Sequence, residues 1–306
     1  MDNLCHTLAG AAFGEAGLKS RSRFGNATLM IASNLPDLDV LVYATSSSAV
    51  AFRRGWTHGV LAQALLPVGL ALIVAAVARC RPAAPGGPPL RVGWLLLLSY
   101  LGVTVHVLMD LLNTYGVRLL MPLDRRWFYG DALFIIDPWM WLMLGGGVWL
   151  ARTRHAPRPA RIAIAAAACY VLLMVASALA ARQVVSTAWV ARAGAAPHAL
   201  MVGPVPVTPF RREVIVDAGD RYVTGAFTWL PLAVTFDAET VAKHDRDPRV
   251  VRTESAPAVR GFLVWARFPY WTFDPSPGGT RVSVRDMRVR EQLQGRFAGS
   301  AIVTGH

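Results

Sequence analysis

The stretch Val60-Leu-Ala-Gln-Ala-Leu-Leu-Pro-Val-Gly-Leu-Ala-Leu-Ile-Val-Ala-Ala-Val-Ala-Arg79 is an almost uninterrupted apolar run. A helix of about 20 residues rises roughly 30 Å, which is the thickness of the hydrocarbon layer of a bilayer. The run therefore predicts a helix that crosses a membrane. Further spans are expected at Val92–Leu112, Leu133–Ala151 and Arg161–Ala181, which makes about four full spans.

The first 44 residues contain two apolar segments that are short or broken. They are Leu4–Leu18 and Ala27–Tyr43, the second interrupted by Pro36. We expect an N-terminal helical hairpin of incomplete helices, packed inside the bundle. Residues 1–181 are thus predicted to form an α-helical integral membrane bundle.

The remainder of the chain, residues 182–306, has a different character. It carries 16 Lys and Arg and 11 Asp and Glu, whereas the longer first part carries only 15 and 8. After an exit helix and linker over 182–200, turn residues separate segments rich in β-branched and aromatic residues, which predicts a β-rich soluble domain. The expected strands are Glu213–Asp217, Arg221–Leu230, Ala233–Phe236, Gly261–Phe268 and Thr280–Arg288.

Composition excludes several classes of protein. The chain is 54% hydrophobic and only 16% charged, against about 25% charged residues in ordinary soluble proteins. The net charge of +12 comes without a Lys/Arg run of the kind that binds nucleic acid, so no nucleic-acid partner is expected. The oligomeric state is not predicted.

The basic residues indicate how the bundle is oriented. Three clusters, around Lys19, Arg79 and Arg154, hold 10 Lys and Arg, and the intervening loops hold 5. Because cytoplasmic loops carry the excess of positive charge, we expect a multi-pass protein with both termini outside the cytoplasm. The soluble domain is then predicted to lie outside as well.

Histidines and aspartates of separate segments are expected to reach one depth. His6, Asp37, His106 and Asp137 lie 13 to 15 residues from their nearest basic cluster, about 20 Å along a helix. His58 precedes the Val60–Arg79 span and reaches the same layer. Ionisable groups at membrane depth are costly unless they are paired, protonated or bound to a cation.

Their types and spacing favour a metal site. His106 and Asp110 lie at i and i+4 on one helical face, which Asn113 extends. Pro36 places Asp37 and Asp39 on irregular backbone, which is tolerated at membrane depth only inside protein or a wet cavity. Imidazole and carboxylate together suit zinc, manganese or iron. The predicted ligands of one or two divalent ions, with zinc preferred, are His6, Asp37, Asp39, His58, His106 and Asp110.

Simpler interpretations stay open for single members of this set. A His–Asp pair at i and i+4 is often only a hydrogen-bonded pair, and Asp37 with Asp39 could be an exposed turn. Asp137-Pro138 has the form of a helix start, with Asp as the cap and Pro in the first turn.

The motifs resemble those of a known family. The stretches that carry this resemblance are Met1-Asp-Asn-Leu-Cys-His6, Asn34-Leu-Pro-Asp-Leu-Asp39, Arg53-Arg-Gly-Trp-Thr-His58, His106-Val-Leu-Met-Asp110-Leu-Leu-Asn-Thr-Tyr-Gly116 and Phe134-Ile-Ile-Asp137-Pro138. Over about residues 1–155 the chain looks like the YdjM family of inner-membrane, metal-dependent hydrolases, labelled LexA-regulated. The resemblance implies a location in the bacterial inner membrane, with the soluble domain in the periplasm. More weakly, the chain resembles zinc-dependent phospholipase C and related single-strand nucleases, which implies phosphoester chemistry.

The functional hypothesis is hydrolysis of a phosphoester or a lipid-like ester by a metal-activated water. Asp37 or Asp137 is the expected general base, and a membrane lipid or another phosphoester is the expected substrate. The residues expected to bind its anionic group are Arg53, Arg54, Asn113, Arg125 and Arg126, although the arginines could instead anchor the interface. The main alternative is a non-enzymatic membrane regulatory or scaffold protein with a structural metal site. An ion or proton transporter is a third interpretation.

Overall fold

The computed structural model describes residues 1–45, 48–83, 85–290 and 297–304. The chain divides into two compact units. The first, called here the helical unit, consists of Met1–Val40, Arg54–Ser177 and Pro206–Thr208. The second, called the β unit, consists of Leu41–Arg53, Ala178–Val205 and Pro209–His306.

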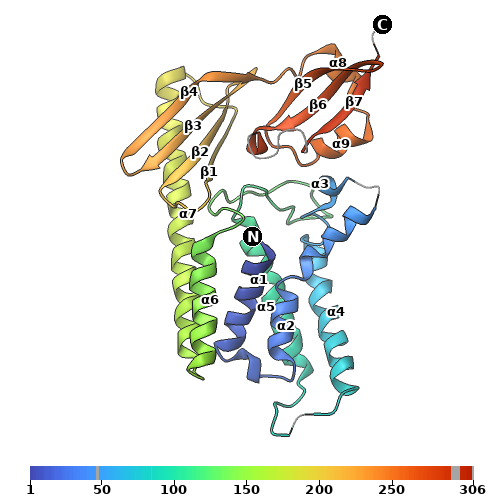
Figure 1. The fold of residues 1–306 in the computed structure, drawn as a ribbon, viewed down its shortest axis with the longest axis vertical. Coiled ribbons are helices and arrows are strands. Elements are labelled where there is room, and N and C mark those ends of the chain that lie inside the picture. Colours follow the sequence, from blue (N-terminus) through green and yellow to red (C-terminus); the bar gives the residue numbers. More distant parts are fainter. Residues whose placement is uncertain (46–47, 84, 291–296, 305–306) are drawn as a thin grey trace. The chain divides into compact units, whose positions relative to one another are not determined.

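The helical unit is built from α-helices that run alongside one another (Figure 1). Helix α1 packs against α2 and α6, while α5 packs against α2 and α4. Two short 3-10 segments, η1 (Leu18–Ser20) and η2 (Leu35–Ala44), follow α1 and α2. The helices are α1 (Asn3–Glu15), α2 (Gly25–Ala32), α4 (Val60–Arg79), α5 (Val92–Leu111), α6 (Pro138–Thr153) and the first part of α7 (Arg158–Ala193).

Among the described residues, three helices are long and apolar enough to cross a membrane: α4, α5 and α7. Their outward faces are apolar, since Leu65 on α4 and Leu172 on α7 are 67% and 69% exposed. Such faces suit a lipid environment. Helical structure in this region is confirmed, but the expected count of about four full spans is not.

The fourth expected span is shorter than its apolar pattern suggests. Helix α6 starts at Pro138, because the Asp137 side chain caps it by accepting a hydrogen bond from Met140 N at 3.0 Å. Its 16 residues rise about 24 Å. The preceding residues 133–137 are not helical.

The N-terminal hairpin also consists of incomplete helices. Helix α1 has 13 residues and α2 has 8, so neither reaches across a bilayer alone. Helix α2 gives way to η2, which contains Pro36. Proline lacks the N–H group that an α-helix would need at this position.

Helix α5 turns one face towards its neighbours. Gly102 lets α2 approach closely, since a side chain at this position would collide with Ala32. Because the buried positions recur at i+3 and i+4, the same face delivers polar side chains to the interior. Its buried residues are Leu95, Leu98, Ser99, Gly102, Val103, His106, Val107, Met109 and Asp110.

The described residues of the β unit form two antiparallel sheets, in the orders β1-β2-β3-β4 and β5-β6-β7 (Figure 1). Ala181, Val185 and Trp189 of α7 join the core formed with the first sheet. Three short helices, α3 (Ala49–Phe52), α8 (Pro248–Thr253) and α9 (Pro257–Leu263), and η3 (Met287–Val289) complete the unit. The strands are β1 (Ala199–Pro204), β2 (Arg211–Asp217), β3 (Arg221–Trp229), β4 (Leu232–Ala242), β5 (Pro269–Ser276), β6 (Gly279–Asp286) and β7 (Gly299–Val303).

The strand expected at Gly261–Phe268 is wrong. The segment is the end of helix α9 and the turn after it. Pro257 occupies the first turn of α9, where its missing N–H costs nothing, and Val259 and Phe262 lie buried three residues apart. An apolar run bounded by Pro and Gly fits a strand or a short buried helix equally well.

A buried ion pair fixes the end of β6. The carboxylate of Asp286 accepts hydrogen bonds from Phe268 N at 3.0 Å, Arg288 N at 2.9 Å and Arg288 Nε at 2.9 Å. Burial alone would raise the pKa of Asp286. The Arg288 guanidinium and the backbone N–H groups outweigh burial and hold this pKa below its ordinary value.

Replacing Asp286 with asparagine should destabilise the β unit by roughly 3 kcal/mol, because Arg288 would keep a buried charge without its partner. A lowered carboxyl pKa contributes stability above the ordinary Asp value near 4, and this contribution is lost as pH falls through the folded value. The difference in stability between the variant and the wild type should therefore shrink below about pH 4. Hydrogen exchange of peptides within 265–290 in the full-length protein measures this. Equal protection of both proteins at pH 7 would contradict it, and exposed Asp245→Asn is the matched control.

Candidate metal centre

Four ionisable side chains meet in the interior of the helical unit. Asp37, His58, His106 and Asp110 each offer a ligand atom, these atoms all lie within 4.8 Å of one another, and all four residues are buried. They come from three places: His106 and Asp110 from one face of α5, Asp37 from η2, and His58 from the turn before α4. This group could bind a metal ion.

The spacing of the ligand atoms fits a metal ion. His58 Nε2 lies 3.1 Å from His106 Nε2 and 3.2 Å from Asp110 Oδ2, and His106 Nε2 lies 3.5 Å from Asp110 Oδ2. Ligand atoms about 2.0–2.1 Å from a tetrahedral zinc ion are roughly 3.3 Å from each other. Asp37 Oδ1 is farther out, at 4.0 Å from His106 Nε2.

The orientation of His106 leaves a lone pair facing this group. Its Nδ1 lies 2.8 Å from the carbonyl oxygen of Ser33. A carbonyl oxygen only accepts hydrogen bonds, so Nδ1 carries the proton and Nε2 of the neutral ring has the lone pair. A metal ligand needs that tautomer, and a hydrogen bond from the other ring nitrogen is the usual way to fix it.

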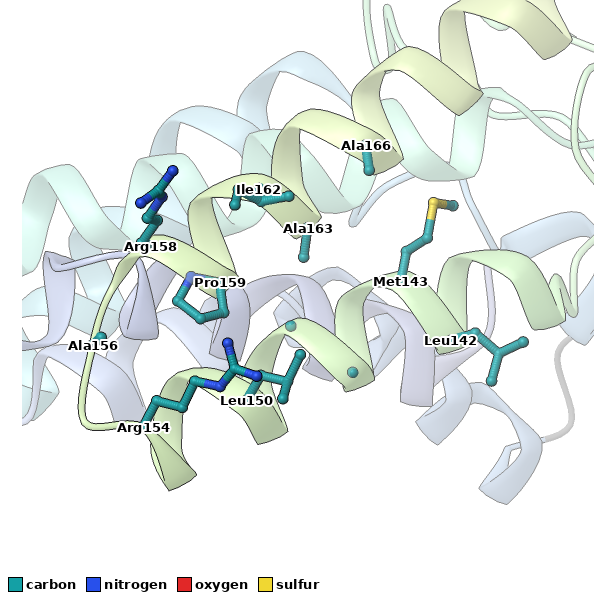
Figure 2. A pocket seen from close by; sticks show the side chains of 12 residues that line it. Leu142, Met143, Leu150, Arg154, Ala156, Arg158, Pro159, Ile162, Ala163 and Ala166 are labelled. Carbon is teal, nitrogen blue, oxygen red and sulfur yellow. The ribbon is translucent and has the colours of Figure 1, made fainter.

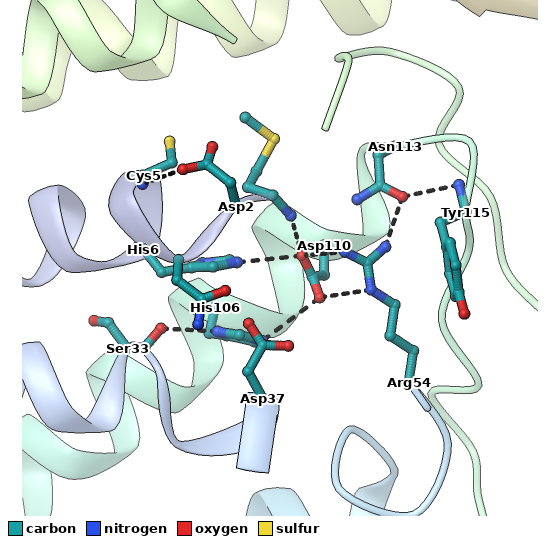
Figure 3. A network of polar contacts seen from close by, with 12 residues as sticks. Asp2, Cys5, His6, Ser33, Asp37, Arg54, His106, Asp110, Asn113 and Tyr115 are labelled. Atoms are coloured by element: carbon teal, nitrogen blue, oxygen red, sulfur yellow. Dashed lines mark hydrogen bonds and ion pairs between the residues drawn. The ribbon is translucent and has the colours of Figure 1, made fainter. Parts of the chain in front are cut away.

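His6 joins the group from α1 (Figure 3). Its Nε2 is 3.2 Å from Asp110 Oδ1, and its ring stacks on that of His106 with centroids 3.8 Å apart. Its buried Nδ1 makes no hydrogen bond with the described residues. The structure thus brings a third imidazole to Asp110, and the amino group of Met1 also forms an ion pair with this carboxylate.

Asp39 lies behind His58. Its Oδ2 accepts hydrogen bonds from Arg54 N at 2.8 Å and Thr57 Oγ1 at 3.2 Å, and is 3.6 Å from His58 Nδ1. Thr57 Oγ1 is itself 2.9 Å from His58 Nδ1. Asp39 is therefore placed to orient the His58 ring, an arrangement common behind metal-binding histidines. Its role as a direct ligand stays a prediction.

Arg54 balances part of the negative charge of the site. Its Nε lies 3.1 Å from Asp110 Oδ2, and its two terminal nitrogens bind Asp110 Oδ1 at 3.1 Å and Asn113 Oδ1 at 2.8 Å (Figure 3). The guanidinium carbon lies 4.7 Å from the centroid of the Tyr115 ring, a cation–π contact. Arg54 thus compensates the charge of Asp110 directly, together with the Met1 amino group.

Other predicted site residues lie elsewhere. Asp137 caps α6, and its Oδ2 accepts a hydrogen bond from the Tyr170 hydroxyl at 3.0 Å. Arg125 and Arg126 are on an exposed loop, where Arg126 pairs with Asp124 at 2.5 Å. Arg53 belongs to the β unit. The roles predicted for these four residues stay predictions.

Sequence reasoning missed the groups that orient the site. Ser33 acts through its backbone carbonyl. Every residue has such a carbonyl, so the residue type gives no signal of this role. Thr57 and Tyr115 belong to the quoted motifs. The hydroxyl of Thr57 next to His58, and the ring of Tyr115 two residues after Asn113, could have indicated their roles.

Fold and site together define a membrane protein whose helical unit holds a buried Asp/His/His/Asp group that could bind a metal ion. A family model described as YdjM inner membrane protein matches residues 1–184, more than half of the chain. The chain belongs to this family, as its motifs predicted. Family and helices together support a location in the inner membrane. No curated protein and no solved structure matches the chain. The weaker resemblance to phospholipase C is therefore not supported by these comparisons.

Proposed function

We propose that the protein is a membrane-bound, metal-dependent hydrolase that cleaves a phosphoester or a lipid-like ester. One observation carries the proposal: three buried imidazoles and the Asp37 carboxylate gather around Asp110. These are five ligand side chains, whereas a structural zinc site is closed by four. More than four ligands are enough for the two-metal arrangement of phosphatases and nucleases, and a cationic side chain lies beside them.

The proposed ligands of one or two divalent ions, zinc being preferred, are His6, Asp37, His58, His106 and Asp110. When bound, such an ion lowers the pKa of a water ligand to near 7 and polarises the ester. Ser33 and Asp39 would keep the His106 and His58 rings in the ligand orientation. Asp37 is the general base we prefer, because it belongs to the group and is its least buried member at 7% exposure. Its carboxylate would take up the proton that water gives up.

Arg54 and Asn113 are the proposed contacts for the anionic part of the substrate. A guanidinium presents five donors in a fixed plane, and in Arg54 this plane is held by Asp110, Asn113 and the Tyr115 ring. It could therefore add a bond to a phosphate or carbonyl oxygen without changing its position. Arg125 and Arg126 are proposed as outer contacts. A lipid substrate would enter from the periplasmic leaflet.

The second candidate function is non-enzymatic: a regulatory or scaffold protein with a structural metal ion. The complete burial of His6, His58, His106 and Asp110, each 0% exposed, favours it, because a structural ion needs no access for substrate. The two candidates differ in what Asp37 does.

Elemental analysis of purified full-length protein, paired with a screen of phosphoesters and lipid esters, tests the proposal. We expect bound divalent metal, and hydrolysis that stops with a chelator and returns with zinc or manganese. In protein loaded to the metal content of the wild type, Asp37→Asn should lower kcat by about 10²–10⁴, the usual contribution of a general base. Asp137→Asn should leave kcat unchanged, since asparagine is also a good helix cap. Metal-loaded protein inactive throughout the screen would support the structural alternative, and a kcat loss confined to Asp137→Asn would move the base to α6.

A further inference from the structure

A groove of about 640 Å³ runs between α6 and α7, and none of the metal-centre residues lines it (Figure 2). Gly147 forms part of its floor, where a side chain would collide with Ala163, so the two helices meet closely there. At Gly146 an added Cβ would meet nothing within 4 Å. Leu142 and Ile162 border the groove and are 67% and 59% exposed. Its lining is apolar except at one end.

That end carries two arginines. Arg154 follows the last residue of α6 and Arg158 is the first residue of α7. Both side chains line the groove and lie at the same end of it (Figure 2). Within the described parts of the chain, no hydrogen bond or ion pair engages either guanidinium. Two uncompensated positive charges therefore stand where the apolar groove ends.

The length of the groove matches one leaflet. From Leu142 to Leu150 the lining residues of α6 rise about 12 Å, and half of a hydrocarbon layer of roughly 30 Å is about 15 Å. With the arginines at the loop end, the groove repeats the layout of one membrane lipid: a charged group at the surface and an apolar tail directed inward.

We propose that this groove binds one anionic phospholipid of the bilayer, with an acyl chain along α6 and α7 and the phosphate between Arg154 and Arg158. Charge selects this occupant: a guanidinium pair matches an anionic head group, whereas a helix of a second copy would leave both arginines without partners. A zwitterionic lipid carries its own compensating cation, so it gains less binding free energy from the two arginines. This site is independent of the proposed hydrolase activity.

Native mass spectrometry of delipidated full-length protein, titrated with phosphatidylglycerol or phosphatidylcholine, tests the head-group contact. The wild type should retain one phosphatidylglycerol in preference to phosphatidylcholine. Arg154→Gln with Arg158→Gln should weaken phosphatidylglycerol binding about 30-fold, because each basic residue near an anionic lipid is worth about a factor of five. The matched control is Arg79→Gln with Arg81→Gln, two exposed arginines at the end of α4, and should leave binding unchanged.

A second pair of variants tests the acyl-chain contact. Gly146→Leu adds a side chain to the groove from a position where a Cβ meets nothing within 4 Å, and should reduce retained phosphatidylglycerol at least tenfold. Gly69→Leu makes the same change on α4, where an added Cβ also meets nothing within 4 Å, and should have no effect.

Three results would overturn the proposal. One is equal binding of the two lipids by the wild type. Another is equal loss in the Arg79/Arg81 control, which means general attraction to basic loops. The third is a dimer that Gly146→Leu dissociates while lipid binding persists, because the groove would then hold a second copy of the chain.

Discussion

Replacing Asp110 with asparagine should remove bound divalent metal from the purified protein, leaving less than a tenth of the wild-type stoichiometry. Asp110 lies near all three imidazoles, at 3.2 Å from His6 Nε2 and His58 Nε2 and 3.5 Å from His106 Nε2. Asparagine keeps the volume and one oxygen but loses the charge that would hold a cation. His106→Gln should have the same effect.

A graded comparison separates ligands from the groups that orient them. Asp39→Asn should weaken metal affinity by about 10–100-fold without abolishing it, as expected for a residue acting through a histidine ligand. Elemental analysis and calorimetric titration with zinc measure these effects. His198→Ala, an exposed histidine of the β unit, should change nothing.

Folding must be separated from metal loss in these variants, because Asp110→Asn leaves Arg54 buried beside a neutral group. Helical circular dichroism and a single size-exclusion peak identify folded protein. Folded Asp110→Asn and His106→Gln proteins that bind zinc as tightly as the wild type would place the metal elsewhere and end the proposal.

Gly102→Leu should be the most damaging change among the glycines of α5. An added Cβ would come within 3.0 Å of Ser33 N and would also collide with Ala32, so α2 would have to move away from α5. Overpacking of this kind costs about 1–3 kcal/mol. Since the Ser33 carbonyl orients His106, metal affinity should fall together with the melting temperature.

Gly93→Leu is the matched control, because Gly93 lies on the same helix and an added Cβ there meets nothing within 4 Å. Gly102→Ala should be intermediate. Thermal unfolding in detergent, with zinc titration of the folded fraction, compares the three variants. If Gly102→Leu protein melts and binds zinc like Gly93→Leu protein, contact between α2 and α5 does not position the metal centre.

In the first half of the chain, the sequence predicted the bounds of a helix well where its apolar run was uninterrupted. The expected Val60–Arg79 span coincides with α4, and α5 ends one residue before the predicted limit. The predicted Leu133–Ala151 span began too early, because apolar content alone does not show at which residue a helix is capped. Asp137-Pro138 is the capping signal, and the helix begins there although the residues before it are apolar.

In the β unit, β-branched and aromatic content and turn residues located β2, β3 and β4, but β1 was not expected and the Gly261–Phe268 segment was misassigned. A short apolar run carries no period long enough to distinguish a strand from one turn of buried helix. There the choice was made by packing of Val259 and Phe262, which the sequence does not contain.

The sequence by itself determined that ionisable side chains would lie within an apolar helical bundle, and that His106 and Asp110 would share a helical face. Residue type and helical period are local properties, so they can be read along the chain. Only the tertiary structure decided that Asp37, His58, His106 and Asp110 meet, that Asp39 stands behind His58, and that Arg54 binds Asp110. Such distances join segments dozens of residues apart. They depend on how closely α2, α4 and α5 pack, which one glycine, Gly102, helps to set.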